Sequence, residues 1–204
     1  MKHYINILYD KANHRKGHVS IMYMKDYIRR EKYLFSRFPS DLTDFCDLKQ
    51  AMMKTPFDTA YMTFLALCTF RTDPRRGIEM LSYVRGTFHF SEKEKSEIKA
   101  ALNGKEYIPY SFFEGAYPYN NYQPLRPYKL EIYEMPYSFS ENGYAKLAVQ
   151  SSGAEEPRTV TLRQKNDRWF FWDQELLGDV IKPTAADSWS CSDHSTADYI
   201  PHNS

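Results

Sequence analysis

One change in sequence periodicity constrains the fold of this chain of 204 residues more than any other feature. Between residues 39 and 104 the apolar side chains recur at steps of three and four, which is the period of a helix packed on one face. From residue 128 to residue 164 they mostly alternate with polar side chains, which is the period of a β-strand. The sequence therefore predicts helices followed by strands.

Local start signals divide the first part into four short helices. In chain order these signals are Ser40 as an N-cap, Thr55-Pro56, Asp73-Pro74 and the capping box of Ser91 and Glu94. Gly86 is expected to end the third helix, because glycine favours the position after a helix terminus. The second helix has the widest apolar stripe, with Phe64 at its middle, and should therefore lie at the centre of the core.

Four predicted strands follow, separated by short links. Three runs of alternating residues begin near Tyr128, Tyr144 and Thr159, and the fourth strand is the aromatic run that begins at Trp169. Because parallel strands need long crossover connections, these links predict an antiparallel meander. The fold class is thus α+β, with four short helices followed by a small antiparallel β-meander. We expect both halves to share one core with Phe64 and Trp169 largely buried, because neither half can cover its apolar face alone.

Composition divides the chain into three parts. Residues 1–38 are a basic N-terminal extension, for which a hairpin, a helix over Ile21–Phe35 and disorder all remain open. Residues 39–183 form a single α+β domain, which is helical to residue 104 and contains an aromatic connection and the sheet from residue 105. Residues 184–204 are rich in Ser, Thr and Asp and are predicted to be a flexible tail.

The aromatic connection from Tyr107 to Pro127 contains many tyrosines and prolines but has no regular period. It must be an ordered irregular segment, because so many large rings would otherwise be exposed. Its residues Tyr119, Asn120, Asn121 and Tyr122 have two interpretations. They form a structural clamp, since amide side chains can hold irregular backbone, or they form a ligand or partner surface.

Motifs for catalysis, metals and cofactors are missing from the sequence. It contains no glycine-rich phosphate loop, nucleophile elbow or HExxH pattern. His14 and His18 have the spacing of two metal ligands but no third candidate nearby, so a solvated loop is the better interpretation. Solvated faces or loops also explain the remaining polar groups, which are Ser151-Ser152-Gly153, Glu155-Glu156 and the series Asp41, Asp44 and Asp47. No catalytic residue, metal or cofactor is predicted.

Basic residues near the N-terminus suggest contact with nucleic acid. Lys25, Arg29, Arg30 and Lys32 are interleaved with tyrosines, which could together hold phosphates and stack on bases. The first 38 residues contain nine Lys and Arg against three Asp and Glu. The remaining chain is acidic on balance and would repel a polyanion, so a solvated basic arm is favoured over nucleic-acid binding.

The cysteines and the apolar runs of the sequence indicate where in the cell the protein is located. Cys46, Cys68 and Cys191 are odd in number and far apart, which disfavours a disulfide framework. A secretory signal and a membrane-spanning apolar run are both missing. We therefore expect a cytoplasmic protein that does not enter a membrane.

Residues from Phe38 to Pro183 carry a dispersed set of motifs. The set comprises Phe38-Pro39-Ser40, Phe113-x-Gly115-Ala116, Asn120-Asn121-Tyr122-x-Pro124, Pro127-Tyr128, Gly143-Tyr144-Ala145-Lys146-Leu147, the run from Ser152-Gly153-Ala154 through Pro157-Arg158 to Val160-Thr161-Leu162-Arg163, and Trp169-Phe170-x-Trp172. With these motifs the chain resembles an uncharacterised bacterial family of domains of unknown function. The resemblance implies helices followed by strands, and it implies no activity.

These observations favour a non-catalytic binding or protein-interaction module with a protein or peptide partner. Two alternatives remain. One is a small-molecule-binding or enzymatic site in a cone between the helices and a curved sheet. The other is nucleic-acid binding through the basic N-terminus.

Overall fold

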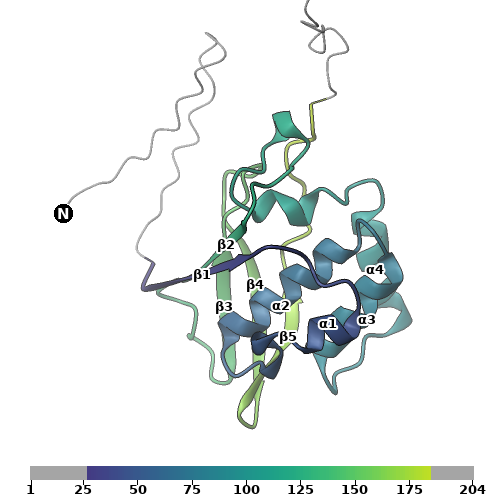
Figure 1. Cartoon of the computed structure of the whole chain (residues 1–204). Helices are drawn as coiled ribbons and strands as arrows, with labels where there is room; N and C mark the ends of the chain where they lie inside the picture. The colour runs from purple at the N-terminus through teal and green to yellow at the C-terminus, as the bar shows by residue number, and fades with distance from the viewer. Residues whose placement is uncertain (1–26, 185–204) are drawn as a thin grey trace, which may run out of the picture.

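The structure of the chain, a computed structural model, describes residues 27–184. In chain order its elements are β1 (Arg29–Phe35), α1 (Leu42–Cys46), the 3-10 helix η1 (Lys49–Met52), α2 (Pro56–Thr69), α3 (Pro74–Arg85), α4 (Glu92–Leu102), the 3-10 helices η2 (Ile108–Phe112) and η3 (Pro118–Asn120), β2 (Tyr128–Glu134), β3 (Tyr144–Val149), β4 (Arg158–Lys165) and β5 (Arg168–Gln174). The predicted α+β class, the α-helices and the antiparallel meander are confirmed (Figure 1). One strand, β1, precedes the helices.

Three of the four expected N-caps are present. The side chains of Thr55, Asp73 and Ser91 each accept a hydrogen bond from a backbone N–H in the first turn of α2, α3 and α4, respectively. The prediction of Ser40 as the cap of α1 is wrong. Asp41 caps this helix and accepts from the Asp44 N–H at 2.9 Å, because α1 begins one residue later than the pattern suggested.

Strand β1 lies inside the segment that we expected to be an extension of the domain. Its seven residues pair in antiparallel register with β2, from Arg29 opposite Glu134 to Phe35 opposite Tyr128. This strand excludes the helical alternative for residues 29–35, and residues before 27 lie outside the described part of the chain. The sheet therefore includes residues on the N-terminal side of the boundary predicted at residue 39.

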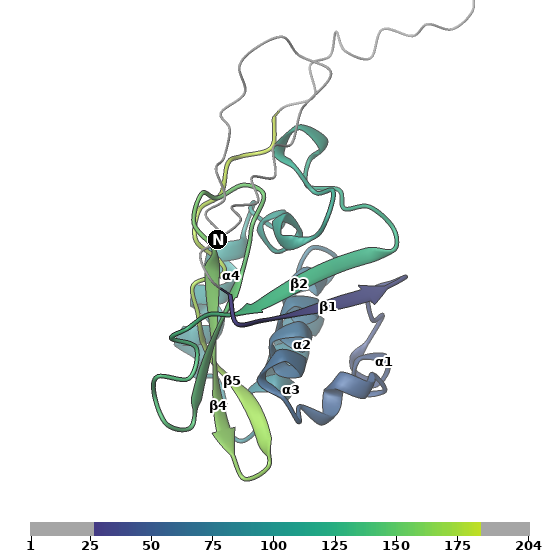
Figure 2. The ribbon, with the colours of Figure 1, turned by 90° about the vertical axis from the view of Figure 1, so that its left-hand side faces the viewer.

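The five strands lie in the order β1-β2-β3-β4-β5, with antiparallel neighbours. β2 and β3 pair only through Tyr133 with Ala148 and Glu134 with Leu147. In Figure 2, β1 and β2 run across the view, whereas β4 and β5 run from top to bottom. Helices α2 and α3 lie on one side of the sheet, and α4 lies beyond β5 in Figure 1. No helix of residues 27–184 covers the opposite face of β3, β4 and β5, which we call the outer face.

Helix α2 is the centre of a single core shared with the sheet. Phe64 is completely buried and contacts Phe112 edge to face, with ring centroids 5.1 Å apart. Buried sheet residues of the same core include Leu130, Leu147, Leu162 and Phe171. The shared core is confirmed, but the expected burial of Trp169 is only partial. Trp169 is the second residue of β5 after the β4–β5 turn, so its ring lies at the rim of the core, against Phe139.

Candidate functional site

The aromatic connection is a rigid, hydrogen-bonded segment, and Asn120 is its main clamp. The Asn120 amide nitrogen donates to the carbonyls of Gly115 at 2.7 Å and Gln123 at 3.1 Å. Its oxygen accepts from the backbone N–H groups of Tyr117 at 2.8 Å and Gln123 at 3.3 Å. These four bonds satisfy backbone groups on both sides of η3 and so hold this irregular segment in place. The clamp interpretation of Asn120 agrees with this geometry.

Tyr122 also faces the interior of the connection. Its side chain is completely buried, its ring stacks on Tyr107 with centroids 5.4 Å apart, and its hydroxyl donates to the Ile181 carbonyl. Burial, together with the neighbouring Tyr107, raises the pKa of Tyr122 to about 12. Tyr122 therefore ties the connection to residues near the end of the described chain and is not available to a partner.

The other two predicted residues point outward. The Tyr119 side chain is 69% exposed and its ring stacks on Tyr117, with centroids 5.2 Å apart and planes at 10°. Asn121 is exposed and adopts a left-handed backbone conformation with φ of 54°, which asparagine tolerates better than most residues. The structure thus separates the predicted set into two buried or clamping residues and two surface residues.

A hollow of about 240 Å³ lies beside Asn121 and is lined by Arg71, Glu106, Tyr107, Asn121 and Pro183. The Arg71 guanidinium lies over the ring of Tyr110, 5.0 Å from its centroid. Within residues 27–184, Arg71 forms no ion pair with a carboxylate. The hollow therefore contains both the Arg71 guanidinium, which has no ion-pair partner within these residues, and the carboxylate of Glu106.

Two large apolar side chains flank this region and were not anticipated from the sequence. Leu125 is 61% exposed and Ile181 is 63% exposed. Leu125 packs on Gly115, where a β-carbon would lie 2.3 Å from the Leu125 Cγ atom, and Gly115 has a φ of 81°. The glycine in Phe113-x-Gly115-Ala116 was the one sequence signal for this close packing.

The serines of the β3–β4 loop have structural partners. Ser151 is buried, its hydroxyl lies 2.7 Å from that of Ser111, and it accepts from the Gly153 N–H at 3.1 Å. Ser152 donates to the backbone carbonyls of Ser111 and Ala116. These hydroxyls therefore join the loop to the aromatic connection, as expected for a strand-connecting loop.

The predicted nucleic-acid residues lie on β1 beside carboxylates, apart from Lys25, which lies outside the described residues. Arg29 pairs with Glu31, and Glu131 lies 3.4 Å from Arg30 and 3.3 Å from Lys32. Burial raises the pKa of Glu131, but the hydrogen bonds from Tyr133 and Lys32 and the charge of Arg30 lower it overall. Much of the positive charge on this strand is therefore neutralised within the protein.

The acidic residues of α1 also have local partners. Asp41 is the N-cap, and Asp44 forms two hydrogen bonds with Arg37 and accepts one from the Ser40 N–H. The Arg37 hydrogen bonds lower the pKa of Asp44 to about 2. Residues 27–184 contain no cluster of three or more metal-ligating side chains, and none of their helices has the length and apolar character needed to span a bilayer. His14 and His18 lie outside this range.

Residues 37–184 match the model of a protein family described as a domain of unknown function, DUF6935. This match confirms the resemblance to an uncharacterised domain family. No curated protein and no solved structure matches the chain.

Proposed function

The chain belongs to this family, DUF6935, and we propose that it is a binding module for an extended peptide segment of another protein. The binding surface consists of Tyr119, Asn121, Leu125 and Ile181 together with the hollow beside Arg71, and we call it the η3 surface. The observation that carries the proposal is the rigid display of exposed apolar side chains on a clamped irregular segment.

A surface on which several large apolar side chains are exposed is a candidate interaction site. Tyr119, Leu125 and Ile181 are each more than 60% exposed, and the backbone segments that carry them are hydrogen-bonded together. The Thr184 N–H donates to the Pro118 carbonyl at 3.1 Å, which holds the Ile181 segment beside η3. A surface that is already ordered loses little conformational entropy when a partner binds, so more of the interaction energy appears as affinity.

The unpaired Arg71 guanidinium indicates one group that the peptide would carry. The Arg71 guanidinium offers several N–H donors in a fixed plane, and a carboxylate is the side chain that matches this geometry. The Asn121 side chain adds an amide that can bond to peptide backbone. We therefore propose a peptide with an acidic residue near an aromatic or aliphatic one.

The other two functions predicted from the sequence have less structural support. The space between α2 and the sheet contains the buried core, with Phe64, Leu65, Leu130 and Leu147 among its members. On β1 the cations are paired with Glu31 and Glu131. Neither arrangement favours a cone-shaped cavity or a phosphate-binding strand.

Selection from a random peptide library tests the proposal directly. We expect wild-type protein to enrich peptides that pair an Asp or Glu with an apolar residue. The Tyr119→Ala and Arg71→Gln variants should each bind the enriched peptides about tenfold more weakly, a loss of about 1.4 kcal/mol. Tyr137→Ala is the matched control, because Tyr137 is 50% exposed on the β2–β3 loop. Peptides that bind all four proteins equally well would contradict the proposal.

A further inference from the structure

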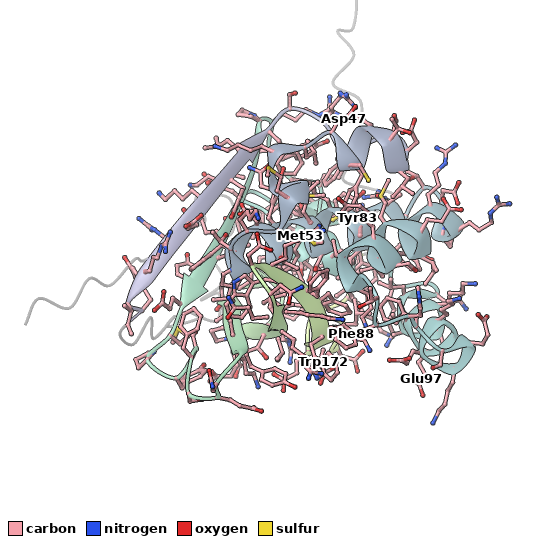
Figure 3. All side chains as sticks on the ribbon, turned by 90° about the horizontal axis from the view of Figure 1, so that it is seen from below. Asp47, Met53, Tyr83, Phe88, Glu97 and Trp172 are labelled. Atoms are coloured by element: carbon pink, nitrogen blue, oxygen red, sulfur yellow. The ribbon has the colours of Figure 1, made fainter. Side chains whose placement is uncertain are left out.

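The outer face of the sheet carries a cluster of rings around one arginine. The Arg163 guanidinium lies 4.5 Å from the ring centroid of Trp172, 5.2 Å from that of Phe88 and 5.5 Å from that of Tyr144. Figure 3, in which Phe88 and Trp172 are labelled, shows these two residues close together below the sheet. All four residues are half-buried, so the cluster is partly accessible to solvent. The Arg85 guanidinium also lies near the Trp172 ring, 5.4 Å from its centroid.

Strand register explains why these side chains meet. Tyr144 on β3 is directly opposite Arg163 on β4, so their side chains share the outer face. A register shift between Thr161 and Leu162 leaves Trp172 as an extra residue in β5, between the partners Phe171 and Asp173. Such a bulge changes the direction of a side chain, and Trp172 reaches the outer face beside Arg163. Phe88 comes from the loop that follows α3.

A second cation lies next to the cluster. The Lys165 Nζ atom is 5.3 Å from the ring centroid of Phe88 and 3.3 Å from the Thr87 hydroxyl. In the described part of the chain, neither Arg163 nor Lys165 forms an ion pair with a carboxylate. Their neighbour Lys146 differs, because it lies 3.3 Å from Glu175. Arg163 and Lys165 therefore carry positive charges that no ion pair within residues 27–184 neutralises.

We propose that this outer-face cluster binds single-stranded nucleic acid. Arg163 and Lys165 would contact phosphates, and unstacked bases would pack on the accessible sides of Trp172, Tyr144 and Phe88. A sheet face with solvent-accessible rings suits single strands, because the bases of a duplex are already stacked on one another. An acidic peptide would use the two cations but not the three rings.

Binding of a labelled single-stranded oligonucleotide of about ten nucleotides to the full chain tests this inference. We expect the affinity to fall steeply between about 50 and 200 mM salt. The Arg163→Gln/Lys165→Gln variant should bind at least about tenfold more weakly, and its log–log salt dependence should be less steep by about 1.4, which corresponds to two lost phosphate contacts. The Lys93→Gln/Lys99→Gln variant on α4 removes the same charge and should bind like wild type.

Two further measurements separate the cluster from general charge and from misfolding. An abasic oligonucleotide of the same length should bind at least about tenfold more weakly, because it cannot stack. Arg163→Lys keeps the charge and should retain most of the affinity, and thermal melting should show that each variant is folded. Absence of oligonucleotide binding at low salt, equal binding of the abasic chain, or equal losses in the outer-face and α4 variants would each overturn the inference.

Discussion

The ring of Tyr33 on β1 stacks on the ring of Tyr61 on α2, with centroids 4.3 Å apart and planes 9° from parallel. Tyr33 is 8% exposed and Tyr61 is 4% exposed, so this pair belongs to the core. The pair connects β1 with α2, although α1 and η1 lie between these two elements in the sequence. The strand that precedes the helices is therefore an integral part of the packed fold.

Replacement of Tyr33 tests whether β1 contributes to the stability of the whole domain. Tyr33→Ala should lower the free energy of unfolding by about 3 kcal/mol, because it removes a buried ring and leaves a cavity beside Tyr61. Leu34→Ala is the neighbouring control, since Leu34 is 63% exposed, and should change it by less than about 0.5 kcal/mol. Denaturant unfolding measures both. Equal stability of the two variants would show that β1 is not part of the cooperative unit.

Phe64 provides a test of the single shared core. Phe64→Ala should cost about 3 to 5 kcal/mol, because the ring is completely buried between α2 and η2. Unfolding followed by far-ultraviolet circular dichroism and by tryptophan fluorescence should give one coincident transition in the wild type and in the variant. Two separate transitions, with only one shifted by the substitution, would indicate that helices and sheet unfold independently.

Asn120 and Asn121 are adjacent and chemically identical, but the structure assigns them different roles. Asn120→Ala should lower the free energy of unfolding by about 1 to 3 kcal/mol, because backbone groups of Tyr117 and Gly115 lose their partners. Asn121→Gly should change it by less than about 0.5 kcal/mol, since glycine accepts the φ of 54° and the side chain is exposed. A larger loss of stability in Asn121→Gly than in Asn120→Ala would contradict the role of Asn120 as the clamp.

Features encoded by neighbouring residues were predictable from the sequence. The caps at Thr55, Asp73 and Ser91 depend on residues within one helical turn, and the alternation in β2 to β4 indicates which side chains face inward. β1 was harder to recognise, because its partner β2 lies far along the chain and its inward face carries Arg29 and Glu31 as well as Tyr33. Pairing over such a distance leaves no local signal.

The candidate sites were even harder to predict from local sequence than β1. Residue type alone could not separate Asn120 from Asn121, because only the backbone conformation and the surrounding carbonyls distinguish them. The cluster around Arg163 combines residues from three strands and a loop, and its geometry depends on a bulge in β5. Arg71 likewise meets Asn121 only because the connection folds back onto the end of α2.

Alkaline pH should reveal the burial of Tyr122. Burial raises the pKa of this phenol from 10.0 to about 12, so the folded state favours the protonated form. The protonated Tyr122 phenol therefore contributes fully to the free energy of unfolding below about pH 10. This contribution is lost as the pH rises from about 10 to about 12. In this window the free energy of unfolding should fall less steeply for Tyr122→Phe than for wild type, with the exposed-site variant Tyr137→Phe as control. Parallel pH profiles for Tyr122→Phe and wild type would contradict the assigned burial.

The most direct test of the η3 surface is a map of where a selected peptide contacts the folded protein. A titration followed by backbone amide chemical shifts in ¹⁵N-labelled protein provides that map. We predict the largest shifts at Arg71, at residues 106–107 and 119–121, at Leu125, and at residues 181, 182 and 184. Shifts on the outer face of β3, β4 and β5 should be small. Shifts centred on that outer face, or no saturable shifts near Tyr119, would contradict the proposal that the η3 surface is the peptide-binding site.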